Sequence, residues 1–240
     1  MSGVIALPLM AIVTLVAGLG LIKLGRVIGG RSLKARHANP AINYQIHYQT
    51  IALAAAVAFV ALLSLINNGG FIGVGVLDAR AEQFGWMGFD ADVTWMTAGL
   101  TFLILPTLGT AIVSYSQVAK QTKLVGNRFI QALSWGLLFS LTNSLTEELI
   151  FRVGLAQVLG ATEFASYLPW VTAAVFGGLH YFGTPGKVIG VLMAGFLGWA
   201  LMWSILETHG IAWAWAIHCA QDIPILTLII WKSLSETGQS

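Results

Sequence analysis

Long apolar segments that carry almost no charge dominate this chain of 240 residues. Such segments limit the possible folds, because a bilayer-spanning α-helix needs roughly 20 mostly apolar residues. Seven segments qualify or nearly qualify: residues 4–22, 48–66, 96–115, 129–153, 166–182, 188–206 and 211–231. A transmembrane barrel would show shorter segments with alternating polarity. We therefore predict an all-α fold, a polytopic membrane helical bundle with about seven transmembrane helices.

The composition agrees with lipid as the outer solvent of this bundle. Only 9% of the residues are Asp, Glu, Lys or Arg, whereas soluble domains carry roughly 25%. The single cysteine, Cys219, excludes an intramolecular disulfide and any cysteine-based zinc site. We expect the lipid bilayer as a partner and no nucleic acid, and the sequence leaves the oligomeric state open.

Basic residues in the connections predict the orientation. Ten of them fall on one side if seven helices alternate: Lys23, Arg26, Arg31, Lys34, Arg36, Lys120, Lys123, Arg128, Lys187 and Lys232. The other side holds one basic residue, Arg80, and most of the acidic loop residues. This asymmetry predicts an N-terminus outside and a C-terminus inside, most simply in a bacterial plasma (inner) membrane.

The chain divides by its pattern of polar residues, although we expect one membrane domain. Residues 1–128 form an N-terminal three-helix region, in which loop 67–94 reads as an interfacial segment because it mixes aromatic residues with acids and glycines. Residues 129–231 contain the polar clusters described next, and residues 232–240 form a tail. Residues 4–22 are interpreted as a retained span, because no basic segment precedes them and no clear cleavage site follows.

Ionisable residues within the predicted spans occur in three clusters only. Their sequences are TEELIFR at 146–152, FGGLH at 176–180 and HCAQD at 218–222. Charged side chains inside a membrane are costly and usually face a cavity or a partner. The three clusters therefore mark a candidate functional site.

The spacing within the first cluster gives it a geometry. Glu148 and Arg152 are four residues apart, so they share a helix face and can form an ion pair, for which a structural role is the favoured interpretation. Glu147 lies about 100° around the helix and can point elsewhere. Asn143 precedes Glu147 by four residues and is placed to hydrogen-bond it.

The other clusters supply groups suited to hydrolysis. His218 and Asp222 are four residues apart, so both can face one cavity. A buried glutamate such as Glu147 is a candidate base, and a histidine such as His180 suits proton transfer. Two histidines and a carboxylate also form a common zinc set. The chain lacks the HExxH pattern, so the usual geometry of zinc peptidases is absent, but the spacing leaves zinc open as an alternative.

The three motifs together resemble those of a known family. EELIFR matches EExxxR, FGGLH matches FxxxH and HCAQD matches HxxxN/D, in this order on late membrane helices. The set is similar to the CAAX-protease and bacteriocin-processing (CPBP, or Abi) family of intramembrane glutamic endopeptidases. The resemblance covers roughly residues 129–231, and the earlier helices add only hydropathy.

The resemblance implies roles for the candidate residues. Glu147 would activate the attacking water with help from His180, and His218 and Asp222 would line the oxyanion site. The remaining positions are expected to hold the site in shape: Asn143, Glu148, Arg152 and Phe176. No metal and no other cofactor is implied. Asp222 departs from the Asn that prenyl-protein proteases often have there, and an ionised Asp cannot donate to an oxyanion. It would either be protonated or orient His218.

The predicted function is an intramembrane endopeptidase that hydrolyses a peptide bond of a membrane-associated protein or peptide. Two alternatives stay open: a proton-coupled membrane transporter, and a peptide-binding or immunity protein without catalysis. The substrate, its cleavage site and its prenylation cannot be read from the residues. Straight helices with the predicted bounds would also place Glu147 and His180 at different depths.

Overall fold

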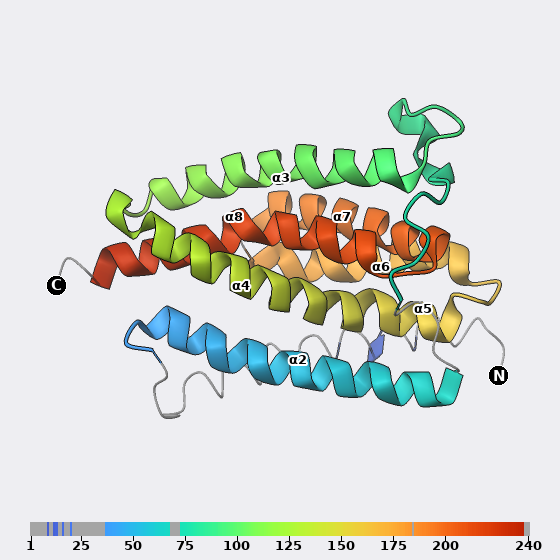
Figure 1. Cartoon of the computed structure of the whole chain (residues 1–240), viewed down its shortest axis with the longest axis horizontal. Helices are drawn as coiled ribbons and strands as arrows, with labels where there is room; N and C mark the ends of the chain where they lie inside the picture. The colour runs from blue at the N-terminus through green and yellow to red at the C-terminus, as the bar shows by residue number, and fades with distance from the viewer. Residues whose placement is uncertain are drawn as a thin grey trace.

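The chain folds as a bundle of long helices (Figure 1). The computed structural model describes residues 37–67, 73–183 and 185–237 and five isolated earlier positions. The helices are α2 (Pro40–Asn67), α3 (Trp95–Ala119), α4 (Phe129–Glu148), α5 (Gly154–Leu159), α6 (Leu168–Leu179), α7 (Lys187–Thr208) and α8 (Ala212–Thr237). Short turns are η1 (Glu82–Met87), η2 (Gly126–Arg128), η3 (Leu149–Val153), η4 (Ala165–Tyr167) and η5 (His180–Phe182). Apart from one isolated bridge between Arg80 and Thr94, the regular structure of the described residues is helical, which confirms the all-α prediction there.

Four helices are long and apolar enough to cross a membrane, namely Pro40–Leu65, Trp95–Ala119, Lys187–Thr208 and Ala212–Thr237. They correspond to the predicted spans 48–66, 96–115, 188–206 and 211–231, and the chain is an integral membrane protein. The predicted span 166–182 contains α6, which has only 12 residues and is about 18 Å long. The predicted span 4–22 lies almost wholly outside the described residues. The count of seven transmembrane helices is therefore not confirmed.

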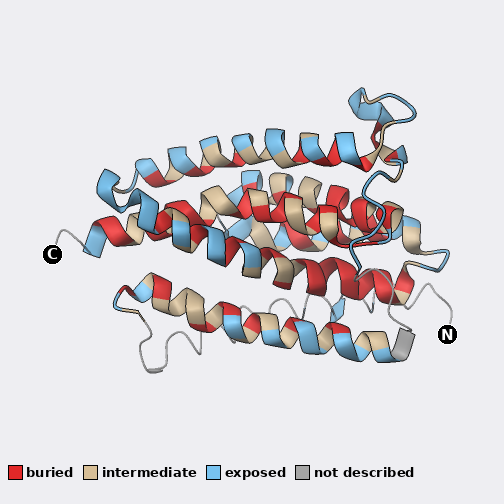
Figure 2. Cartoon of the chain, viewed as in Figure 1, coloured by how far each residue is buried: buried red, intermediate tan, exposed pale blue. Residues whose placement is uncertain are grey.

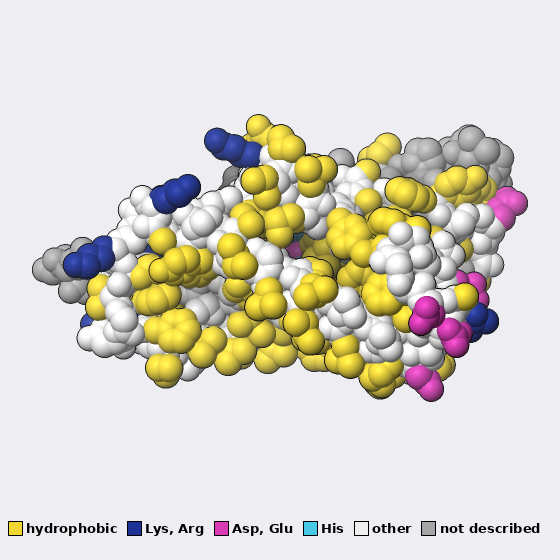
Figure 3. Space-filling view, turned by 90° about the horizontal axis from the view of Figure 1, so that it is seen from above, with side chains coloured by type: hydrophobic (Ala, Val, Ile, Leu, Met, Phe, Trp, Pro, Cys, Tyr) yellow, Lys and Arg dark blue, Asp and Glu magenta, His cyan; other side chains and the backbone are white. Residues whose placement is uncertain are grey.

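Charge separates along the long axis of the bundle. Basic side chains gather toward the end where α8 finishes, and acidic side chains gather at the opposite end (Figure 3). At the first end, Lys232 donates to Gln121 at 2.8 Å. At the second end, Trp95 Nε1 donates to Glu207 at 2.7 Å. We call these the basic end and the acidic end.

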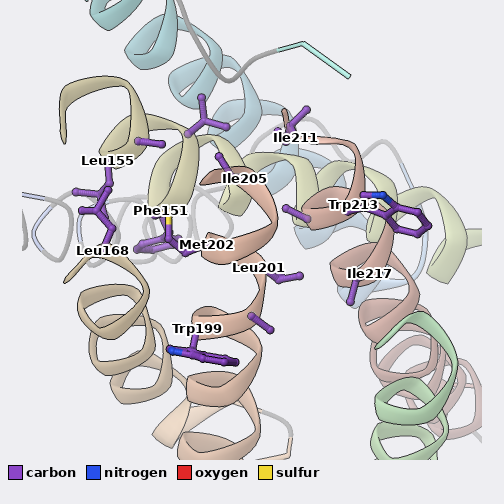
Figure 4. Packing of buried hydrophobic residues seen from close by; sticks show 14 of the residues in the cluster. Phe151, Leu155, Leu168, Trp199, Leu201, Met202, Ile205, Ile211, Trp213 and Ile217 are labelled. Atoms are coloured by element: carbon purple, nitrogen blue, oxygen red, sulfur yellow. The ribbon is translucent and has the colours of Figure 1, made fainter. Parts of the chain in front are cut away.

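An aromatic core closes the acidic end. Phe84, from the long connection before α3, is fully buried and packs edge to face on Trp95 and Trp199. The apolar cluster continues through α5, α7 and α8 (Figure 4). Backbone hydrogen bonds from Val76 to Thr208 and from Ile211 to Gly73 fasten the connection to the α7–α8 turn. The connection is thus partly core, whereas the sequence pattern predicted an interfacial segment.

Small side chains let α4 and α8 pack closely along a seam at the centre of the bundle (Figure 2). Ala132, Gly136, Ser140 and Ser144 recur every fourth residue of α4, and all four are buried. A Cβ at Gly136 would collide with Thr227 of α8. Small residues at this spacing allow helix backbones to approach within a membrane. The close seam brings the end of α4 against the first half of α8.

The helix that begins with α4 continues past its predicted end at residue 153. The π-helical turn η3 follows α4 directly, and α5 extends the helix to Leu159. It continues because Leu155, Ala156 and Leu159 are buried apolar residues that pack in the core. Glu147 therefore lies well inside a long helix rather than near its end.

Candidate active site

The three polar clusters of the sequence meet between α4, α6 and α8. Glu147 and Glu148 end α4, Arg152 lies in η3, and His218 and Asp222 lie on the first half of α8. Turns of π-helix are rare and occur frequently at functional sites. All five residues of η3 are buried, so the wide turn is held by packing on every side.

Glu148 joins the ion pair to a histidine. Its Oε1 accepts hydrogen bonds from Arg152 Nη1 at 2.9 Å and from His218 Nδ1 at 2.6 Å. The side chains of Glu148 and Arg152 are both fully buried. A buried charge needs its partner, so the pair holds this part of the fold. Because Nδ1 donates to a carboxylate, the orientation of the imidazole is fixed and Nε2 faces away from Glu148.

The second ring nitrogen of His218 faces two further carboxylates. Nε2 lies 3.5 Å from Glu147 Oε2 and 3.7 Å from Asp222 Oδ1. Both separations exceed a normal hydrogen bond. Three carboxylates thus surround one imidazole. The resemblance left open whether Asp222 orients His218. In the structure Glu148 holds Nδ1, and Asp222 lies on the Nε2 side.

Asn143 connects the two carboxylates that face Nε2. Its Nδ2 donates to Glu147 Oε1 at 3.2 Å and to Asp222 Oδ2 at 3.0 Å. The bond to Glu147 is the one that the four-residue spacing predicts. The bond to Asp222 crosses from α4 to α8 and was not anticipated. One neutral amide therefore fixes both carboxylates relative to each other.

Phe176 of α6 lies between the charged residues and the second histidine. The Arg152 guanidinium sits 3.9 Å above the ring centroid, which is a cation–π contact. The same ring contacts His180 at 4.3 Å and His218 at 5.5 Å between centroids. Phe176 therefore spaces the two imidazoles.

His180 begins η5, directly after α6, and its ring is also oriented by a hydrogen bond. Nδ1 donates to the Phe176 carbonyl at 2.8 Å, which leaves Nε2 as an acceptor in the neutral ring. Among the contacts of the described residues, none joins His180 directly to Glu147. His180 nevertheless lies near His218, because the Phe176 ring contacts both imidazoles.

A pocket brings both histidines to one space. His180, His218 and Asp222 line it, together with residues of α3 and α7 and of the segment before α7: Pro106, Thr110, Pro185, Gly190, Met193, Ala194, Phe196 and Leu197. The wall is mainly apolar apart from Thr110, Gln221 and the three predicted residues. Figure 3 shows a hollow near the middle of the α3 face, with acidic side-chain atoms visible inside it. The pocket is thus open to the apolar outer surface of the bundle.

Comparison with known proteins covers this part of the chain. Residues 129–223 match the family model described as Type II CAAX prenyl endopeptidase Rce1-like. This match supports a similarity of residues 129–223 to the CAAX-protease family. No curated protein and no solved structure matches the chain. The matched segment contains the three clusters of the site, so the resemblance noted from the motifs is confirmed.

The matched segment does not include every residue that lines the pocket. Pro106 and Thr110 belong to α3, before the matched residues. The motifs pointed to no residue of α3, and the structure adds this helix to the pocket wall. A proline within an apolar span, with threonines one and four residues later, was the available signal. Gln221, which lies inside the HCAQD motif, lines the same pocket.

The arrangement of donors bears on the zinc alternative. Among the described residues, no group of three or more His, Cys, Asp and Glu side chains is arranged to hold a metal ion. Glu148 holds Nδ1 of His218, so only Nε2 of this ring is left to face the pocket.

Proposed function

We propose that the protein is an intramembrane endopeptidase that hydrolyses a peptide bond of a membrane-associated protein or peptide with a glutamate-activated water. The family is a protease family, which supports hydrolysis and implies a peptide or protein substrate. The observation that carries the proposal is the meeting of Glu147 and Asp222 at His218 Nε2, beside the pocket that also contains His180. The same match favours a protease over a transporter or a binding protein.

Glu147 is the proposed general base, with His180 as its partner. Its carboxylate removes a proton from water while the water oxygen attacks the carbonyl carbon of the substrate. The carbon–nitrogen bond of the tetrahedral intermediate then breaks, and the removed proton passes to the leaving amine. The products are a carboxylic acid and an amine. Positioned proton transfer of this kind contributes about 10²–10⁴-fold to a rate.

His218 and Asp222 are proposed to stabilise the oxyanion of the intermediate. Nδ1 of His218 donates to Glu148, so a second proton on the ring would make Nε2 a donor toward the pocket. Asp222 accepts from Asn143 through Oδ2, which leaves Oδ1 on the side of Nε2. A protonated Oδ1 would supply a second donor. Glu148, Arg152, Asn143 and Phe176 keep these groups in place.

A comparison of the termini of membrane proteins tests this proposal and also identifies the substrate. Cells with the wild-type protein and cells with Glu147→Ala would be compared by mass spectrometry of membrane-protein termini. We expect termini that occur only with the wild type. Glu163→Ala, which changes an exposed acid on another loop, should behave as the wild type. Identical termini in the wild type and Glu147→Ala, at equal protein levels, would remove Glu147 from the mechanism.

Catalysis is proposed to proceed without a metal. Purified protein that has been treated with a zinc chelator should retain its cleavage rate, because no described donor set holds an ion. Loss of cleavage that added zinc restores would support the zinc alternative.

The proposed location is a bacterial plasma membrane, with the basic end on the cytoplasmic side. Lys and Arg favour the cytoplasmic side of short loops, and the end of α8 with Lys232 lies at the basic end. A cysteine introduced at the exposed Gly126 should therefore resist an impermeant thiol reagent in intact cells. Rapid labelling at this position would show that the protein has the opposite orientation.

A further inference from the structure

A buried amide joins α8 to the middle of α3 beside the candidate site. Gln221 directly precedes Asp222, and only 5% of its surface is exposed. Its side chain reaches Thr107 and Thr110 of α3. Thr110 is 3% exposed, so this polar contact lies within the bundle and away from solvent.

One of the two orientations of the Gln221 side-chain amide gives hydrogen-bond partners to both its oxygen and its nitrogen. In this orientation the amide bonds to the backbone of α3. In that orientation Gln221 Nε2 donates to the Pro106 carbonyl at 3.3 Å and to Thr110 Oγ1 at 2.6 Å. Oε1 accepts from the Thr107 backbone N–H at 3.0 Å and from Thr107 Oγ1 at 3.1 Å. Both donors and two acceptor positions of the amide are therefore used.

These bonds fall where α3 is weakest. Pro106 lies inside the helix and has no N–H, so one backbone hydrogen bond of α3 is missing, and its ring disturbs the preceding turn. Side chains of neighbouring helices can satisfy the backbone groups that a proline frees in a membrane. Gln221 bonds to both polar groups of the Pro106–Thr107 peptide and thus fastens this turn of α3 to α8.

The same part of α3 forms one side of the pocket mouth. Toward the acidic end, Phe102 of α3 contacts Phe196 of α7, with 6.0 Å between ring centroids. Farther along, Pro106 and Thr110 of α3 and Met193 of α7 all line the pocket. The outward residues of this part of α3 are exposed, namely Ile104, Leu105, Leu108 and Ile112. The position of α3 here therefore sets how wide the pocket opens.

We propose that Gln221 is a positioning residue that clamps α3 at its proline and so sets the width of the opening between α3 and α7. The clamp selects peptides by the bulk of the side chains next to the cleaved bond. This selection rests on the proposed protease function, whereas the clamp itself does not. Gln221→Leu removes all four hydrogen bonds at similar volume and should let α3 move away from α7.

A distance measurement tests the clamp without any cleavage. Spin labels would be placed at the exposed positions Leu108 of α3 and Leu192 of α7, in Cys219→Ala protein in lipid vesicles. Gln221→Leu should lengthen and broaden the distance distribution. Thr110→Val, which removes one bond of the cluster, should give a smaller change in the same direction and serves if the first variant does not fold.

A matched control exists on the other side of the bundle. Gln157 of α5 donates to Ser64 of α2, so it also joins two helices through a partly buried amide, far from α3 in the chain. Gln157→Leu should leave the α3–α7 distance unchanged. Unchanged distances in folded Gln221→Leu and Thr110→Val, or equal changes in Gln157→Leu, would overturn the clamp.

A cleavage assay tests the selection. Two peptides that differ only in having Ala or Trp next to the cleaved bond would be compared by kcat/KM. Gln221→Leu should raise the Trp-to-Ala ratio about tenfold, within the range by which apolar pockets discriminate size. An unchanged ratio despite a changed distance would contradict the selection. Absence of cleavage by the wild type would instead count against the proposed function, and the distance arm would still decide the clamp.

Discussion

The seam between α4 and α8 has two halves with opposite chemistry. Toward the basic end, Ala132 and Gly136 of α4 lie in a stretch that packs with Leu226 and Ile230 of α8, and their side chains are small or apolar. Toward the acidic end, the same two helices present carboxylates, an imidazole and an amide: Asn143, Glu147, Glu148, His218 and Asp222.

The difference shows that one pair of helices both packs closely and forms the candidate site. The small residues allow close approach, and the polar residues can then meet across the seam at hydrogen-bond distance. Glu148 and His218 are 70 residues apart in the chain and 2.6 Å apart in space. Geometry in the polar half thus depends on packing in the apolar half. The predictions below test this division, beginning with the largest effect.

Arg152→Met should destabilise the protein most, because Arg152 of η3 pairs with Glu148 of the polar half. The substitution leaves Glu148 as a fully buried carboxylate without its guanidinium, and breaking a buried pair from one side costs about 3–5 kcal/mol. Thermal unfolding in detergent would measure the loss. Arg128→Met, at an exposed position, should change stability by less than about 0.5 kcal/mol. Equal effects of the two variants would show that the pair does not hold the fold.

Two glycine substitutions with opposite expected signs test the close packing of the apolar half, one within it and one in α3 as the comparison. Gly136→Ala places a Cβ against Thr227, and overpacking of this kind costs about 1–3 kcal/mol. Gly109→Ala places a Cβ where no atom lies within 4 Å, so it should stabilise α3 by up to about 1 kcal/mol through helix propensity. The same unfolding assay compares them. Stabilisation by Gly136→Ala would contradict the close seam.

Asn143→Ala should have the smallest effect on stability and a selective effect on activity. It removes the amide that joins Glu147 to Asp222, and the loss of about 1.4 kcal/mol of transition-state stabilisation is tenfold in kcat/KM. The cleavage assay measures this, and Asn127→Ala at an exposed site provides the control. A tenfold rise in KM with unchanged kcat would indicate a binding role instead.

The local parts of the fold and the site could be predicted from the sequence. The length of the apolar segments predicted four spans that the structure contains as helices. The four-residue spacing predicted the Glu148–Arg152 ion pair and the Asn143–Glu147 hydrogen bond. These features depend on neighbours along one helix, where periodicity determines which residues share a face.

The contacts between helices could not be predicted in this way. The bond from His218 to Glu148 and the bond from Asn143 to Asp222 depend on how α4 packs against α8. The π-helical turn η3 and the shortness of α6 were not predicted either. The part that α3 takes in the pocket was missed because its polar residues are few and uncharged.

The origin of the oxygen atom in the product tests the central claim most directly. The substrate would be a peptide identified by the comparison of membrane-protein termini. It would be cleaved in water enriched in oxygen-18 by purified protein in excess over the peptide, so that each protein molecule cleaves at most one peptide. Direct attack by a water that Glu147 activates predicts one oxygen-18 atom in the new carboxylate after this first turnover. A first-turnover product that carries only oxygen-16, with label entering in later turnovers, would show that an enzyme carboxylate attacked the peptide and would contradict the mechanism.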